Sequence, residues 1–153
     1  MTKFRLSLII LYLLINLSLK AQNKDSIAVM KSVNNFVTAF NNFNWADFRE
    51  SFTDDATIFH PFWNQARRIQ GRREIETAWL TIFPEFGDTN NSRKLQISPK
   101  DINIQLYRQT AIVTFHLGEG VNTLSRRTLI MVKKKRSWKI AHLHASNMSK
   151  NKD

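Results

Sequence analysis

The sequence predicts one α+β domain, because helix patterns come first and strand patterns follow. The 153 residues are enough for a single hydrophobic core, and the composition is ordinary for a globular protein. Apolar and polar side chains alternate on both sides of a basic run in residues 126–147, a pattern typical of a β-hairpin. We therefore expect N-terminal helices packed on one face of a curved antiparallel sheet.

Residues 1–21 have the pattern of a signal peptide. Lys3 and Arg5 precede a nearly continuous apolar run at residues 6–19, and Ala21 supplies a small residue for cleavage. About 14 apolar residues are too few to span a bilayer comfortably, although an uncleaved anchor is the alternative. The lack of cysteine excludes lipid attachment at the cleavage site as well as disulfides. We expect a mature domain at residues 22–153 that is periplasmic or secreted, with no stable membrane span.

The net charge of +11 raises the question of nucleic-acid binding. Removal of the signal peptide takes away three basic residues and leaves +8. The remaining basic residues are spread over the hairpin tip, an arginine cluster at residues 67–73 and the C-terminal end. This distribution is typical of a solvated surface, and export also argues against nucleic acid, so we expect no such partner.

The first two helices are predicted near the start of the mature chain. Residues 24–43 carry apolar side chains at helical spacing. Asn44 can then cap a second, short helix. Phe48 and Phe52 lie one turn apart in this region and should pack inward. Two helices before the strands favour an α+β domain over an alternating α/β one.

Residues 56–60 predict a strand that ends at Pro61. His60 closes the strand and Trp63 follows it. Both can line a pocket mouth, since pockets combine aromatic rings with few polar groups, but a satisfied strand-end histidine and a core tryptophan are equally good interpretations. Residues 53–55 precede the strand and predict a turn. Their two carboxylates are also open to an acid–base interpretation.

A third helix is predicted from Arg72 to about residue 83, where Pro84 ends it. Trp79 lies on its buried stripe, where core packing is the usual role and a ligand contact is the alternative. The strands that follow are expected at residues 94–98, 101–107, 110–117 and 121–132. A two-residue turn at residues 119–120 would place His116 on the same face as Arg127.

The register of the terminal hairpin can be derived from its tip. Either even-length loop places Lys133 opposite Trp138. Strict alternation then places Leu129 opposite His142 and Arg127 opposite His144. The second arm would direct one set of side chains to a pocket wall: Trp138, Ile140, His142, His144 and Ser146.

Two consequences follow from this register. A nearby arginine disfavours the imidazolium, so His144 should stay neutral and suit a base or hydrogen-bonding role. Ala141, Leu143 and Ala145 would form an apolar outer face, which predicts a homodimer through the sheet.

The segment Trp138–Ser146 resembles the closing strand of SnoaL-like domains in the nuclear transport factor 2-like superfamily, and the tail of the calcium/calmodulin-dependent kinase association domain. The resemblance covers roughly residues 24–148, and Gly71–Ile75 resembles the family's usual helix start. It implies a nuclear transport factor 2-like cone, with helices and a curved antiparallel sheet around a pocket. The kinase domain's arginine on the preceding strand falls on Leu129 here, so that anion site is not carried over intact.

The family includes cyclases, isomerases, dehydratases and hydrolases, as well as non-catalytic binding and assembly domains. The resemblance therefore implies a small-molecule ligand and leaves enzymatic activity open. In the enzyme interpretation, His144 or His60 would be the base or acid, and Arg127 would hold an anionic or enolate oxygen. The other candidate ligand contacts are His142, His116, Trp63 and Trp79.

We expect neither a metal nor a cofactor. Imidazoles at i and i+2 share a strand face, but the four histidines lack the cysteine or carboxylate companions of a usual zinc site. The sequence also shows no Ser-His-Asp order, phosphate-binding loop or dinucleotide glycine pattern.

Overall fold

The computed structural model describes residues 2–60, 67–88, 90–118, 124–135 and 137–147, with backbone alone for residues 2–21. Its elements, in chain order, are α1 (Thr2–Asn41), α2 (Trp45–Glu50), β1 (Phe52–Phe59), β2 (Ile69–Gln70), α3 (Arg72–Ile82), the 3₁₀ helix η2 (Pro84–Gly87), β3 (Lys100–Tyr107), β4 (Thr110–Leu117), β5 (Ser125–Lys134) and β6 (Ser137–Asn147).

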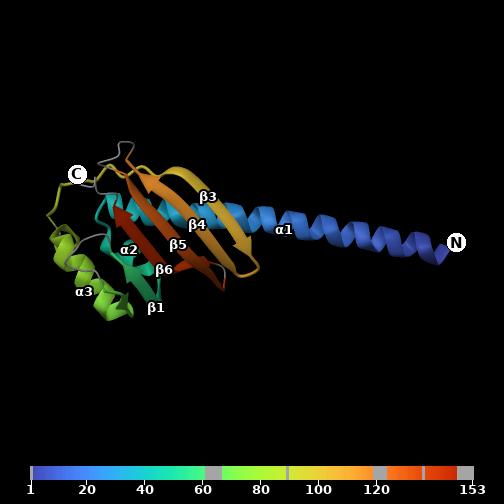
Figure 1. Cartoon of the computed structure of the whole chain (residues 1–153), viewed down its shortest axis with the longest axis horizontal. Helices are drawn as coiled ribbons and strands as arrows, with labels where there is room; N and C mark the ends of the chain where they lie inside the picture. The colour runs from blue at the N-terminus through green and yellow to red at the C-terminus, as the bar shows by residue number, and fades with distance from the viewer. Residues whose placement is uncertain (1, 61–66, 89, 119–123, 136, 148–153) are drawn as a thin grey trace, which may run out of the picture.

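The strands form one open, curved sheet in the order β2-β1-β6-β5-β4-β3. Neighbouring strands run antiparallel except β1 and β6, which are parallel. The helices lie at one face of this sheet, α1 along β3–β6 and α3 beside β1 (Figure 1). This arrangement is the predicted α+β cone of the nuclear transport factor 2-like type, and the fold class is confirmed.

Helix α1 begins well before the predicted residue 24. It runs without interruption from Thr2 to Asn41, and its first half extends beyond the sheet (Figure 1). Its second half buries Val29, Val33, Phe36 and Ala39 against the core. Within the part of the chain that the structure describes, no helix is long and apolar enough to cross a membrane.

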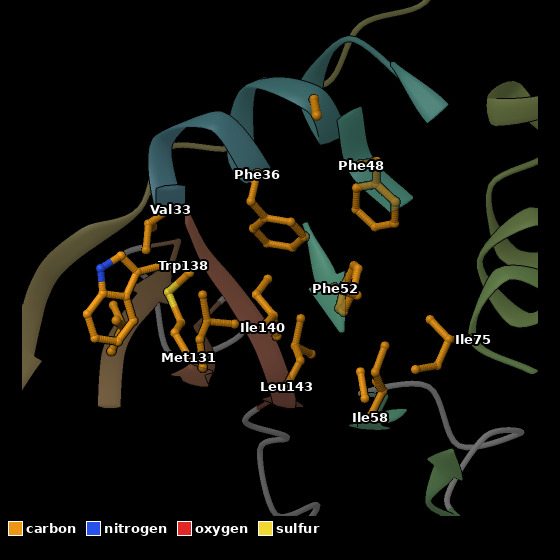
Figure 2. Packing of buried hydrophobic residues seen from close by; sticks show 14 of the residues in the cluster. Val33, Phe36, Phe48, Phe52, Ile58, Ile75, Met131, Trp138, Ile140 and Leu143 are labelled. Atoms are coloured by element: carbon orange, nitrogen blue, oxygen red, sulfur yellow. The ribbon is translucent and has the colours of Figure 1, made fainter. Parts of the chain in front are cut away.

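Aromatic rings fill the space between the helices and β1. Phe36 of α1, Phe48 of α2 and Phe52 of β1 approach one another, with ring centroids 5.4 Å apart for the first pair and 5.5 Å for the second (Figure 2). Phe48 also contacts Trp79 of α3 at 5.0 Å. Since aromatic side chains bury large apolar areas, this cluster joins α1, α2 and α3 to the sheet.

The turn predicted at residues 53–55 is wrong, because these residues lie within β1. The pairing of β1 with β6 is irregular here: Phe52 pairs with Ile140, and the next pair is Thr57 with His142. The Asp54 carboxylate is exposed and accepts a 2.7 Å ion-pair contact from Arg72 Nε. Its surroundings are those of a solvated ion pair, which carries little energy, rather than of an acid–base pair.

Residues 94–98 do not form the predicted edge strand. One side chain of α1 holds this segment instead: Asn41 Nδ2 donates to the Ile97 carbonyl (2.9 Å) and Asn41 Oδ1 accepts from the Ile97 amide (2.8 Å). The Leu95 amide donates to the Asn41 carbonyl at 2.9 Å. These bonds take the place of strand pairing and direct Leu95 and Ile97 toward the cavity described below.

Candidate functional site

The terminal hairpin contains a bulge at Ala141 that decides which side chains face inward. Near the tip the predicted register is confirmed, with Lys133 opposite Trp138 and Met131 opposite Ile140. The register then shifts between Met131 and Ile130, so that Ile130 pairs with His142 and Ala141 is the extra residue. A bulge of this kind places two residues opposite one and reverses the alternation beyond it.

The side chains that follow the bulge therefore point to the side of the sheet opposite to the predicted one. Ile140 and Leu143 point to the same side, toward the core (Figure 2), and Ala145 is buried on that side as well. His142 and His144 lie on the outer face. Their expected position on the pocket wall is wrong, and so is the expected position of Leu143 and Ala145 on an outer dimer face.

The predicted neighbours of Arg127 change for the same reason. Arg127 pairs with Ala145, and His144 pairs with Thr128. On the other side Arg127 pairs with Phe115, while His116 pairs with Arg126 and lies on the outer face. The shared face expected for His116 and Arg127 is wrong, because Leu117 pairs with Ser125, so that His116 alternates with Arg127 instead of lying on its side of the sheet. The expected turn itself lies outside the described residues.

A cavity of about 210 Å³ lies between α1, α3 and the inner face of the sheet. Its walls are mainly apolar and come from every layer of the fold: Phe36, Val37, Phe40, Trp79, Phe83, Leu95, Ile97, Phe115, Leu117, Leu129, Leu143 and Ala145. Two ionisable side chains, His60 and Arg127, also line it. An apolar cavity with a few convergent polar groups is the usual form of a small-molecule site.

His60 and Arg127 stand on either side of Ala145. Phe59 pairs with His144 in the parallel ladder of β1 and β6, so the next residue, His60, lies beside Ala145. Arg127 pairs with Ala145 from the other side. The imidazole that follows β1, the methyl group of Ala145 on β6 and the guanidinium of Arg127 on β5 thus form a row that lines the cavity.

Arg127 is partly buried and remains free to bind an anion. Its Nη1 donates to the Ser125 hydroxyl and, at 2.9 Å, to the Arg126 carbonyl. Ser125 in turn lies within hydrogen-bonding distance of Asn147 Oδ1, which fixes the guanidinium to the end of β6. Among the described residues no carboxylate pairs with Arg127, and no acceptor engages its Nε or Nη2. Burial lowers the pKa of Arg127 to about 10, so the group is charged at neutral pH.

His60 is 8% exposed and is neutral at physiological pH. Burial, and secondarily the charge of Arg127, lower the pKa of His60 to about 4. Its ring lies edge-on to Trp79, with centroids 4.9 Å apart. The sequence predicted that a nearby arginine keeps His144 neutral. In the structure, the charge of Arg127 lowers the pKa of His60 instead.

Trp79 packs in the core and also lines the cavity. Its position therefore suits both roles considered for it, core packing and ligand contact. It is 5% exposed, and its buried Nε1 has no hydrogen-bond partner among the described residues. Trp63, the other predicted tryptophan, lies outside the described residues.

His142 and His144, the outer-face histidines of β6, form a separate cluster with β1. His142 Nδ1 lies 2.7 Å from the Thr57 hydroxyl, and the Phe59 ring contacts both imidazoles, at 5.8 and 5.6 Å. Burial, and then the charge of His144, lower the pKa of His142. In the described parts of the chain no three histidine or carboxylate groups converge on a metal-sized site.

A second hollow, of about 390 Å³, lies between α1, α2 and the β5–β6 hairpin. Its lining is mostly hydroxyl and amide side chains, with three charged residues among them. Lys139 pairs with Glu50 at 3.4 Å, and Asp47 accepts a 2.8 Å hydrogen bond from Asn44 Nδ2. The hollow therefore offers a ligand no cation without a carboxylate partner. The apolar cavity with Arg127 is therefore the better candidate site.

The sequence-based analysis missed the small and apolar residues of the site, Ala145 and Leu143 above all. A signal for them exists. Buried residues of β6 occur at Trp138, Ile140, Leu143 and Ala145, and the three-residue step in an otherwise two-residue period marks the bulge. No sequence pattern indicated Leu95 and Ile97, because hydrogen bonds from Asn41, and not strand pairing, hold them in place.

Comparison with known proteins identifies the fold family. Residues 29–150 match the family model of the SnoaL-like domain. The chain belongs to this family. No curated protein matches the SnoaL-like chain significantly. Among solved structures, it superposes on a member of the nuclear transport factor 2-like family from Streptomyces avermitilis with a TM-score of 0.68, at 19% identity over 84% of this chain and 99% of that one.

Two further structures illustrate the range of the fold. A ketosteroid isomerase-like protein from Erwinia carotovora atroseptica gives a TM-score of 0.61 at 18% identity, covering 80% of this chain and 95% of that one. The hub of the calcium/calmodulin-dependent kinase from S. rosetta gives 0.59 at 22% identity, covering 78% and 93%. At such identities the similarity shows the fold, and function has to be argued from the cavity.

Proposed function

We propose that this SnoaL-like domain binds a small, mainly apolar molecule through one anionic or carbonyl-bearing end. The observation that carries the proposal is Arg127, a charged guanidinium without a carboxylate partner among the described residues, at the wall of an apolar cavity. The parallel N–H groups of an arginine fork match the two oxygens of a carboxylate. In an apolar surrounding such a contact is stronger than in water.

The polar groups of the cavity favour a ligand that accepts hydrogen bonds. Arg127 and the Trp79 indole can only donate hydrogen bonds, whereas a neutral imidazole such as that of His60 has one donor and one acceptor nitrogen. The cavity volume of about 210 Å³ lies below the usual range for drug-sized ligands, which indicates a compact molecule. A small carboxylate, or an enolisable carbonyl compound with apolar substituents, fits both conditions.

Catalysis by proton transfer is the finer form of this proposal. His60 is the titratable side chain suited to it, because it is neutral and lines the cavity together with Arg127. Arg127 would stabilise an enolate oxygen while His60 accepts a proton. With a pKa of about 4, His60 is a weak base in the free protein, and an anionic ligand would raise that pKa.

Binding can be tested by titrating benzoate, a compact apolar carboxylate, into the parent protein and variants, followed by ligand-observed NMR. Arg127→Met should weaken binding roughly 10- to 100-fold, since hydrogen bonds to charged groups contribute about 1.5–3 kcal/mol. Arg127→Lys should recover only part of the loss, because lysine lacks the planar fork. Arg126→Met, which removes the neighbouring outer-face arginine, is the matched control. Equal binding by all four proteins would contradict the proposal.

A non-catalytic assembly role is the alternative, and the outer sheet face favours it. With the corrected register this face carries Ile112, Ile130 and Phe59 among threonines and histidines, and Phe59 is 36% exposed. We propose that a second copy of the chain covers it. Ile130→Asp should convert a dimer into a monomer in sedimentation, whereas Asn103→Asp on the outer side of β3 should not. A parent protein that sediments as a monomer would refute the dimer.

Export is the remaining part of the proposal. The apolar run at residues 6–19 and the small residue Ala21 support cleavage that releases residues 22–153. The intact mass of the protein recovered from outside the cytoplasm tests the cleavage position directly.

A further inference from the structure

We propose that Ala145 is the specificity-determining residue of the cavity: its small side chain leaves the space between His60 and Arg127 in which a planar carboxylate lies. This inference rests on the proposed function and deepens it, by naming the class of the polar end and the residue that selects it. It concerns binding only and requires no bond to form or break.

The geometry follows from the strand order. Ala145 and Arg127 lie on the neighbouring strands β6 and β5, and His60 directly follows β1, the neighbour of β6 on its other side. Adjacent strands are about 4.8 Å apart, so the backbones of His60 and Arg127 are separated by roughly 10 Å. The methyl group of Ala145 does not fill that distance, and both flanking side chains line the same cavity.

The next row of inward side chains shows that this gap is local. Ile58, Leu143 and Leu129 occupy the same three strands two residues deeper, and all are at most 3% exposed. Large side chains therefore close the floor of the cavity. Among the described inward-facing residues of β6, Ala145 is the small one, and it stands in the row that contains the ionisable groups. Beyond Arg127 the row continues to Phe115 of β4, which also lines the cavity.

The chemistry of the two flanking groups favours a flat acceptor with two oxygens. Arg127 offers Nε and Nη2, which no described residue engages, and the ring of the neutral His60 bounds the space on the opposite side. A carboxylate has one oxygen for each of the two arginine N–H groups. A tetrahedral sulfonate would need room toward the methyl group of Ala145, because its third oxygen lies out of the plane.

The competing explanation is that Ala145 is small only to accommodate core packing. In that case substitutions would change the free energy of unfolding and leave ligand preference unaltered. The two explanations separate when affinity for two differently shaped anions is measured alongside stability.

The experiment compares benzoate with benzenesulfonate on the full mature chain by ligand-observed NMR. The parent should prefer benzoate. Ala145→Val should weaken benzoate binding at least tenfold, because its methyl groups enter the space between the two polar side chains. Ala145→Gly should narrow the preference for benzoate over benzenesulfonate several-fold. His144→Val is the matched control, since it adds the same β-branched side chain one residue away on the outer face, and it should leave both affinities unchanged.

Each outcome decides a separate point. If the parent and Ala145→Val bind benzoate equally while Arg127→Met does not bind it, the role of Ala145 is refuted and the proposed function stands. If the parent binds neither anion, the proposed function fails and this inference fails with it. If Ala145→Val does not fold, as judged by near-UV circular dichroism, the glycine variant decides: an unchanged preference refutes the inference.

Discussion

Replacing Phe48 by alanine is expected to lower the free energy of unfolding by about 3–5 kcal/mol, the usual cost of deleting a fully buried aromatic side chain. Phe48 is 1% exposed and is the only buried residue of the six-residue helix α2. Its ring lies 4.7 Å from Phe86 and 5.0 Å from Trp79, centroid to centroid. Since Trp79 also lines the cavity, the loss should reach the site as well as the core.

Denaturant unfolding of the mature chain measures this effect, with Phe48→Leu as an intermediate that removes the ring and keeps apolar volume. Tyr107→Ala is the control, because Tyr107 is 58% exposed and its loss should change stability by no more than about 0.5 kcal/mol. A loss below about 1 kcal/mol for Phe48→Ala would mean that the packing of the helices on the sheet does not depend on this ring.

Periodicity predicted most elements of this fold, because most of them bury one face only, but it failed at residues 53–55 and 94–98. The stripe of α1 and the alternation in β4 and β5 are direct consequences of packing against a single inner surface. The tip of the hairpin was equally predictable, since a short even-length loop fixes the pairing of Lys133 with Trp138.

The bulge at Ala141 could not be derived from the hairpin alone, because it belongs to the contact between β6 and β1. Both irregularities occur at one level: β1 shifts between Phe52 and Thr57, where β6 passes from Ile140 to His142. The Ile140 amide also donates to the Ser51 carbonyl at 2.8 Å, at the end of α2. A partner far away in sequence thus determines which face the last residues of β6 present.

This one shift explains why the candidate site was only partly predictable. Arg127 lies on β5 and His60 follows β1, so both are outside the part of β6 that the bulge reverses. Both side chains line the same cavity. His142 and His144 follow the bulge and face outward. Ala145 acquires its importance only because it lies between two polar residues from other strands, a relation that no local pattern contains.

His60 should make the protein sensitive to acid in a defined pH range. Its pKa is about 4 in the folded protein and near the ordinary 6.5 in the unfolded chain, so the unfolded state takes up a proton first as the pH falls. This group therefore contributes its full stabilisation above pH 6.5 and loses it as the pH falls from 6.5 to about 4. A shift of this size changes the free energy of unfolding by at most about 3.4 kcal/mol. Because solvent can reach His60 through the cavity, we expect a change of about 2 kcal/mol.

The measurement is the free energy of unfolding of the parent and of His60→Gln between pH 7.5 and 4. Carboxylates titrate in both proteins, so the difference between the two curves isolates His60. That difference should shrink by about 2 kcal/mol toward acid pH, because only the parent must keep an uncharged imidazole in the apolar cavity. His144→Gln supplies the baseline for an exposed outer-face histidine. Parallel curves for the parent and His60→Gln would show that His60 is hydrated in the folded protein, and the cavity would then be too wet to give Arg127 the strength that anion binding requires.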